Sequence, residues 1–75
     1  MANEITFQAI EFPSAFEALQ HTEAAGGQAV LLDGRNFVMT QAEADRVAAA
    51  GVEFAYLVQH EMPDGEWRIM TIPVN

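Results

Sequence analysis

Two histidines and the acids near them are the residues that could take part in catalysis or metal binding. His21 follows Glu17 by one helical turn, so the carboxylate could orient the imidazole as a general base. No Ser or Cys is placed to act as the nucleophile that such a base would serve. The sequence therefore predicts a surface histidine at this position.

A second group surrounds a predicted turn and consists of His60, Glu61, Asp64 and Glu66. Imidazole and carboxylate groups bind divalent ions, but this spacing matches no known metal-binding loop, and two histidines without cysteine do not complete a structural zinc site. Tyr56 lies among predicted core positions, and Asp33-Gly34-Arg35-Asn36 has the composition of a turn. We therefore expect no enzyme active site, no metal and no cofactor.

Charge narrows the range of partners. The chain contains eleven acidic residues and three arginines, and its net charge is −8. A nucleic-acid surface needs several converging cations, and anionic lipid would be repelled, so we expect neither as a partner. The acids are spread singly along the chain, which is typical of a solvated surface. The alternative is an array of carboxylates that imitates DNA phosphates.

Length and composition indicate one small domain, residues 1–75. At 75 residues a fold buries only about 60% of its unfolded surface, so contact with a partner would add useful stability. No stretch approaches the ~20 apolar residues of a membrane span, and the N-terminal residues carry no basic or apolar segment. We expect a cytoplasmic protein.

Two copies of a helix-start signal organise the chain. Ser14-Ala15-Phe16-Glu17 and Thr40-Gln41-Ala42-Glu43 have the capping-box pattern, in which a hydroxyl and a carboxylate bond reciprocal backbone N–H groups. Glycines follow both predicted helices. The resulting prediction is strand 4–11, helix 15–25, strand 28–33, strand 36–40, helix 41–50, strand 52–61 and strand 66–74.

Turn chemistry sets the register of two hairpins. Asp33-Gly34 favours a two-residue type I′ turn, which pairs Val30 with Phe37. Residues 62–66 favour a type I turn closed by a left-handed glycine. That second register places six large apolar side chains on one face of the sheet as a predicted core: Phe54, Tyr56, Val58, Met70, Ile72 and Val74.

The opposite face of the predicted sheet is also apolar. Alternation places on it the five residues for which we predict an interaction surface, namely Leu31, Val38, Leu57, Trp67 and Ile69. Since two short helices cover only one face, these side chains need a partner, and a second copy of the chain is the simplest. The alternative is a local lid, in which Trp67 lies over Pro73 or a strand neighbour.

The first six elements of the order β-α-β-β-α-β-β resemble the ferredoxin-like split β-α-β arrangement, with an extra strand at the C-terminus. The resemblance implies an α+β fold with an antiparallel-rich, five-stranded sheet and both helices on one face. Crossover connections of the usual right hand would place the helices there.

From about Ile5 to Ala49 the chain also resembles the Phd/YefM-type antitoxins. The likeness rests on a strand, a helix ending Glu23-Ala24-Ala25-Gly26-Gly27, the hairpin Ala29-Val30-Leu31-Leu32-Asp33-Gly34-Arg35 and a second helix containing Glu43. The family implies operator-DNA binding through basic N-terminal positions and a toxin-binding C-terminal tail. This chain has no basic residue before Arg35 and ends in a predicted hairpin, which departs from both features.

The sequence therefore predicts a non-enzymatic interaction module that binds a second copy, or a small protein partner, through its open sheet face. A small-ligand-binding regulatory domain is a second hypothesis. A Phd/YefM-like antitoxin or an acidic DNA mimic is a third.

Overall fold

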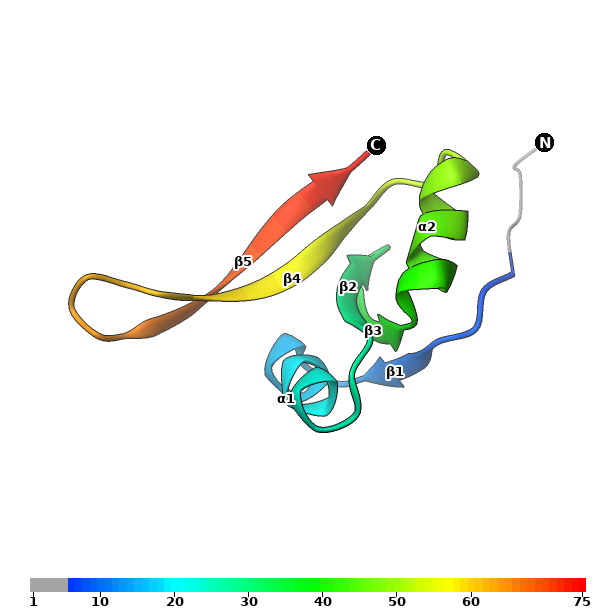
Figure 1. Ribbon diagram of the computed structural model, residues 1–75. Helices are drawn as coiled ribbons and strands as arrows, with labels where there is room; N and C mark the ends of the chain where they lie inside the picture. Colours follow the sequence, from blue (N-terminus) through cyan, green and yellow to red (C-terminus); the bar gives the residue numbers. More distant parts are fainter. Residues whose placement is uncertain (1–5) are drawn as a thin grey trace.

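Strands and helices alternate in the predicted order. The computed structural model describes residues 6–75, and their elements are β1 (Ile10–Phe12), α1 (Ala15–Ala25), β2 (Gln28–Leu32), β3 (Arg35–Met39), α2 (Gln41–Ala49), β4 (Phe54–Glu61) and β5 (Trp67–Val74) (Figure 1). The first strand is shorter than the predicted 4–11. Residues 4 and 5 lie outside the described part of the chain, and residues 6–9 form no strand. Every later element lies within two residues of its expected bounds.

Each helix begins at a hydroxyl side chain, as predicted. Ser14 Oγ accepts a hydrogen bond from the Glu17 N–H at 3.2 Å, and Thr40 Oγ1 accepts one from the Glu43 N–H at 3.1 Å. The two carboxylates do not return the expected bond to the cap. Glu17 accepts a hydrogen bond from the Ser14 hydroxyl. Glu43 accepts hydrogen bonds from the Gln8 N–H and from the Arg46 guanidinium.

The five strands form one antiparallel sheet in the order β1-β3-β2-β4-β5. Both predicted hairpin registers are confirmed along their whole length, β2 with β3 and β4 with β5. Asp33 and Gly34 have φ angles of 53° and 76°, as a type I′ turn requires, and Gly65 at 90° closes the second turn. The turn residues therefore determine which side chains share a face.

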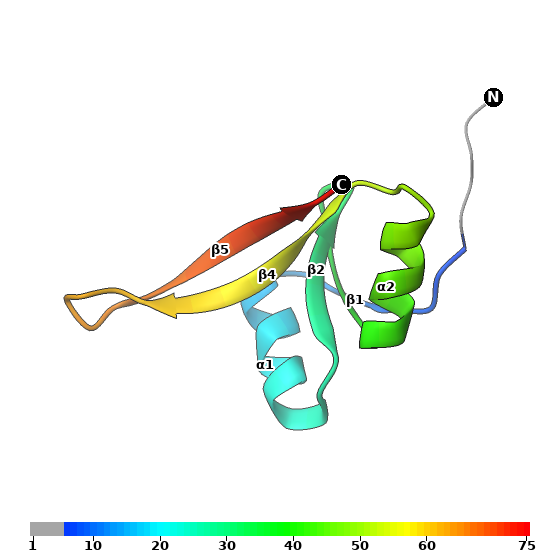
Figure 2. The ribbon, with the colours of Figure 1, turned by 45° about the horizontal axis from the view of Figure 1, so that its top comes forward.

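The two helices lie on opposite faces of this sheet, which corrects the prediction of a common face (Figure 2). The α1 face carries Ala29, Val38 and Leu57 under α1, and the α2 face carries Val30, Met39 and Phe54 under α2. Neighbouring residues of a strand point to opposite sides of the sheet. Ala29 packs in the cluster under α1 and its neighbour Val30 in the cluster under α2, so the two helices must lie on opposite faces.

The strand order explains why the helices separate. β1 and β2 run parallel with β3 between them, and β3 and β4 run parallel with β2 between them. Both crossovers therefore advance in the same direction across the sheet, although they start from strands that run oppositely. Crossovers of the same hand then place their helices on opposite faces. A ferredoxin-like strand order sends the two crossovers in opposite directions, which is why it keeps both helices together.

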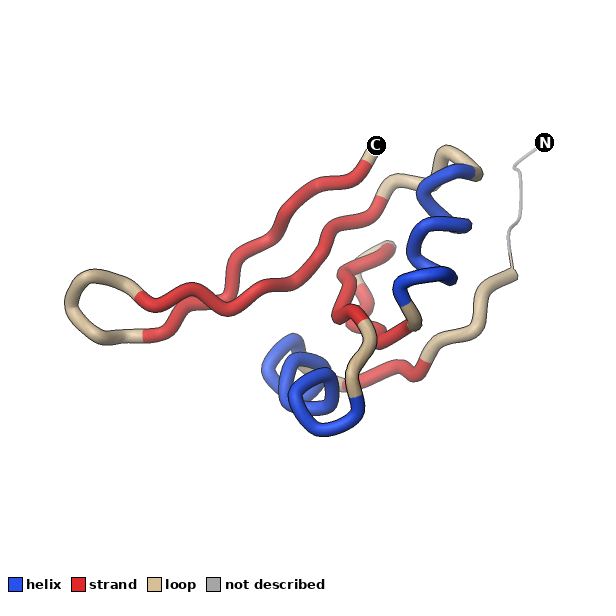
Figure 3. The backbone as a smooth tube through the Cα atoms, viewed as in Figure 1, coloured by secondary structure: helices blue, strands red, loops and turns tan. Residues whose placement is uncertain are grey.

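The β4–β5 hairpin extends beyond the rest of the fold. β2 pairs with β4 only at Val30 with Tyr56 and Leu31 with Ala55. Past these pairs the hairpin continues as a two-stranded ribbon to its turn (Figure 3). The molecule is accordingly elongated, measuring 47 Å by 23 Å by 21 Å. The hairpin, residues 54–74, is called the arm below.

Candidate interaction surface

Among residues 6–75, six large hydrophobic side chains are exposed, and the arm carries four of them. Their exposed fractions are 62% for Trp67, 40% for Ile69, 49% for Met70 and 51% for Ile72. Trp67 and Ile69 lie on the α1 face, because they pair with residues on the same side as Leu57. Met70 and Ile72 lie on the α2 face. The arm is therefore apolar on both sides.

The predicted core face of the arm is covered only at its base. Phe54 is 6% exposed under α2, and Val74 is half-buried beside it. Met70 and Ile72 were expected in the same core but are exposed, since neither helix reaches the outer part of the arm. The alternation of side chains along the two strands is as predicted. Cover by a helix is what the sequence pattern did not show.

The predicted interaction surface divides into two parts. Leu31, Val38 and Leu57 pack against α1, and the last two are each only 6% exposed. These three residues belong to the core, because α1 occupies the face that was expected to be open. Trp67 and Ile69 remain exposed on the arm.

The alternative prediction, in which Trp67 forms a local lid over Pro73, is wrong. Trp67 pairs with Glu61 near the turn, and Pro73 pairs with Ala55 at the other end of β5. Six residues of strand separate Trp67 from Pro73, a distance of about 20 Å. The indole ring therefore has no cover from Pro73.

The acids at the tip of the arm stabilise the turn. Asp64 accepts a hydrogen bond from the Glu66 N–H at 3.0 Å, and the Glu66 carboxylate lies 3.7 Å from the Arg68 guanidinium. Within residues 6–75, no three His, Cys, Asp or Glu side chains are grouped closely enough to hold a metal ion. His60 and Glu61 pair with β5 residues in the regular ladder.

The other residues considered for catalysis have structural contacts. The half-buried His21 ring packs against Phe12 with 5.1 Å between ring centroids, whereas the Glu17 carboxylate bonds the Ser14 hydroxyl. The Tyr56 hydroxyl accepts a hydrogen bond from the Gln41 amide at 3.2 Å. The carboxylate and imidazole that could have formed a general base are thus directed to different neighbours.

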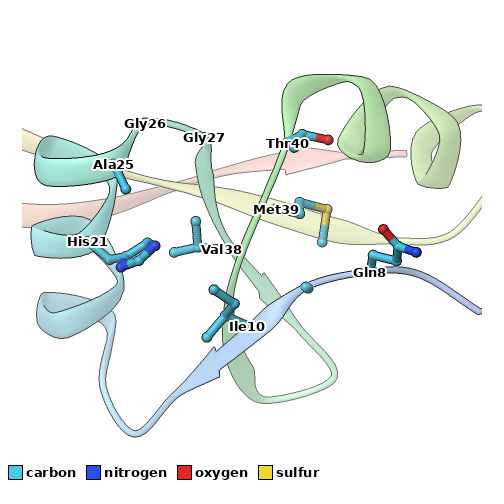
Figure 4. A pocket seen from close by; sticks show the side chains of 10 residues that line it. Gln8, Ile10, His21, Ala25, Gly26, Gly27, Val38, Met39 and Thr40 are labelled. Atoms are coloured by element: carbon cyan, nitrogen blue, oxygen red, sulfur yellow. The ribbon is translucent and has the colours of Figure 1, made fainter.

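One open pocket, with a volume of about 440 Å³, lies between the end of α1, the end of β3 and residues 8–10. Figure 4 shows the side chains of Ile10, His21 and Val38 converging on it from three elements. Two of its polar groups already serve the fold, because Thr40 Oγ1 caps α2 and the Gln8 N–H donates to Glu43. The pocket is large enough for a small molecule but offers few free groups to orient one.

Comparison with known proteins assigns the chain to no family. It matches no protein-family model, no curated protein and no solved structure. No helix among residues 6–75 is both long enough and apolar enough to cross a membrane. The exposed apolar side chains of the arm are the surface feature of these residues that points most directly to an interaction.

Proposed function

We propose that this protein is a non-enzymatic interaction module that joins a second copy of itself through the arm. The exposure of the Trp67 side chain is the observation that carries the proposal. It is 62% exposed on a strand that packs against no helix along its outer half, with Ile69 beside it on the same face. Covering such a ring removes a large apolar area from water and contributes about 1.5–3 kcal/mol.

The construction of the arm supports the same proposal. A two-stranded ribbon is only marginally stable in water, because one partner strand leaves most of its side chains wet. β5 pairs with β4 alone, and all of its residues from Trp67 to Pro73 are exposed. A second protein against β5 would supply the burial that the two helices do not. The apolar residues on both sides of the ribbon would then have a packing role.

The test is the oligomeric state of the wild type and of two matched variants. Trp67→Glu places a charge on the proposed surface, and Phe16→Glu places the same charge on α1 at a side chain that is 53% exposed. In sedimentation velocity at ~10–100 micromolar we expect a dimer for the wild type and for Phe16→Glu. We expect a monomer for Trp67→Glu.

Two results would count against the proposal. A wild type that remains a monomer at ~100 micromolar would show that the arm does not self-associate with useful affinity. Equal loss of the dimer in both glutamate variants would show that added charge, rather than the position of Trp67, controls association.

A further inference from the structure

The sheet has two free edges of very different length. β1 forms one edge, is three residues long and is followed by Pro13. β5 forms the other edge and is eight residues long. An edge strand exposes a row of backbone N–H and C=O groups that can pair with another strand. β5 is therefore the edge with room for a complete additional strand.

The hydrogen bonding at the turn shows which groups of β5 point outward. The Met62 N–H donates to the Glu66 carbonyl, so these two residues form a hydrogen-bonded pair. Bonded and non-bonded pairs alternate along an antiparallel ladder. The next pair, Glu61 with Trp67, is therefore non-bonded, and so is every second pair after it. The residues of β5 whose backbone groups point away from β4 are Trp67, Ile69, Thr71 and Pro73.

Pro73 independently agrees with this assignment. Proline has no N–H, and inside a regular strand it is tolerated where that group would face outward at a sheet edge. The outward row of donors is thus bounded by Pro73 at one end. At the other end it is bounded by the turn, where the Gly65 N–H already donates to Met62. The free donors are the N–H groups of Trp67, Ile69 and Thr71.

We propose that β5 pairs antiparallel with β5 of a second copy about a two-fold axis at Ile69, which makes one continuous sheet. This inference rests on the proposed self-association and specifies how it occurs. A row of donors and acceptors centred on Ile69 is complementary to the same row reversed. Each outward N–H and C=O of Trp67 meets Thr71 of the other copy, and those of Ile69 meet Ile69.

The neighbouring registers are less favourable. An axis at Arg68 would place two arginines directly opposite each other, which is destabilising. An axis at Met70 would place Trp67 opposite Pro73, and the Trp67 carbonyl would then lack a donor. The Ile69 axis avoids both faults. It also sets each Trp67 beside Thr71, and diagonal to Ile69, of the other copy.

A second copy fits this edge better than an unrelated strand. Pairing of β5 with β5 closes both long edges at once, whereas β1 is too short to continue the sheet into a fibre. The charges are compatible, because in this register Arg68 faces Met70 and Glu66 faces Ile72 of the other copy. β5 itself contains no acid, so the pairing brings no carboxylates of the two strands together.

The decisive variant removes one outward donor and leaves the arm intact. Thr71→Pro deletes an N–H that points away from β4, at a position in the same phase as the natural Pro73. Thr71→Ala is the matched control, since it loses the side chain but keeps the N–H. In sedimentation velocity we expect Thr71→Pro to be a monomer and Thr71→Ala to be a dimer. Circular dichroism checks that both variants are folded.

A thiol cross-link gives a second readout that does not depend on the proline variant. The chain contains no cysteine, so Ile69→Cys introduces a single thiol. At the proposed axis the two Cα atoms lie about 5.5 Å apart. His60→Cys is the control on β4, and its two copies are separated by three strand spacings across the sheet, at least about 14 Å. We expect the shortest bismaleimide to link Ile69→Cys into a covalent dimer and to leave His60→Cys unlinked.

The outcomes separate the two proposals. If Trp67→Glu is a monomer while Thr71→Pro stays a dimer and Ile69→Cys does not cross-link, self-association through the arm stands and edge pairing is wrong. A wild type that is monomeric overturns both. If Thr71→Ala is also a monomer, the Ile69→Cys variant decides: a wild-type dimer in which Ile69→Cys does not cross-link overturns edge pairing.

Discussion

Burial of a side chain in this protein depends on whether a helix lies over it. Phe54 and Ile72 occupy the same face of the same pair of strands. Phe54 lies under α2 and is 6% exposed, whereas Ile72 lies outside that cover and is 51% exposed. The strand pattern treats the two positions alike. Only the position of α2 distinguishes a core residue from a surface residue.

Truncation of these two residues should therefore have different effects. Phe54→Ala leaves a cavity beneath α2 and should cost about 3–5 kcal/mol, comparable to the whole free energy of unfolding of so small a domain. Ile72→Ala removes a half-exposed side chain and should cost about 1 kcal/mol or less. Urea unfolding followed by circular dichroism measures both changes. Equal losses would show that the α2 face is covered along the whole arm.

At the scale of elements, the features set by local chemistry could be predicted from the sequence, whereas the strand order could not. The two hydroxyl caps and the two glycine turns act within a few residues, so helix starts and hairpin registers could be predicted from the sequence. The order of the strands could not, because it depends on which hairpin edge meets which. With that order unknown, α1 was expected beside α2. For that reason Leu31, Val38 and Leu57 were assigned to an interface although they form core.

Glu43 joins two segments that are distant in the sequence, α2 and residues 6–8. Its carboxylate accepts from the Gln8 N–H at 2.8 Å and from the Arg46 guanidinium at 2.7 Å, and Arg46 also donates to the Thr6 carbonyl. The hydrogen bonds from Arg46 and Gln8 lower the pKa of Glu43 from 4.5 to about 2. This contact holds residues 6–8 against the start of α2.

The stabilisation from this contact should depend on pH with a defined sign. A carboxylate whose pKa is lower in the folded state stabilises the fold above its unfolded pKa, and this contribution is lost as the pH falls through the folded value. The thermal midpoint of the wild type should exceed that of Glu43→Gln by its largest margin near pH 7. This margin should shrink as the pH falls from about 4.5 to about 2. Glu23→Gln, at an exposed position of α1, is the control. A gap that stays constant over this range would contradict the prediction.

At the scale of the whole molecule, a compact body and a projecting arm have different requirements. The body buries apolar residues on both faces of its sheet, while the arm exposes apolar side chains and a long free edge. A free edge of this kind favours uncontrolled association. The net charge of −8 opposes that association by repulsion between copies. A closed dimer would satisfy the edge and end further growth.

The charge distribution also leads us to predict that the protein does not bind nucleic acid. The chain has three cationic side chains besides histidine, and each lies near a carboxylate: Arg35 at 3.6 Å from Glu11, Arg46 at 2.7 Å from Glu43, and Arg68 at 3.7 Å from Glu66. Phosphates would meet cations that are already paired, within a field of net negative sign. An exposed Trp67 could stack on a base, but stacking without neutralised phosphates gives weak binding.

Fluorescence anisotropy with labelled single-stranded and double-stranded oligonucleotides tests this prediction. We expect no saturable change with protein up to ~100 micromolar at ~50 mM salt. Glu66→Gln is the informative companion variant, because it frees Arg68 from its carboxylate and still leaves the net charge strongly negative. It should not bind either. Binding by the wild type that weakens as salt is added would contradict the charge argument, and it would favour the DNA-binding role that the likeness to Phd/YefM-type antitoxins implies.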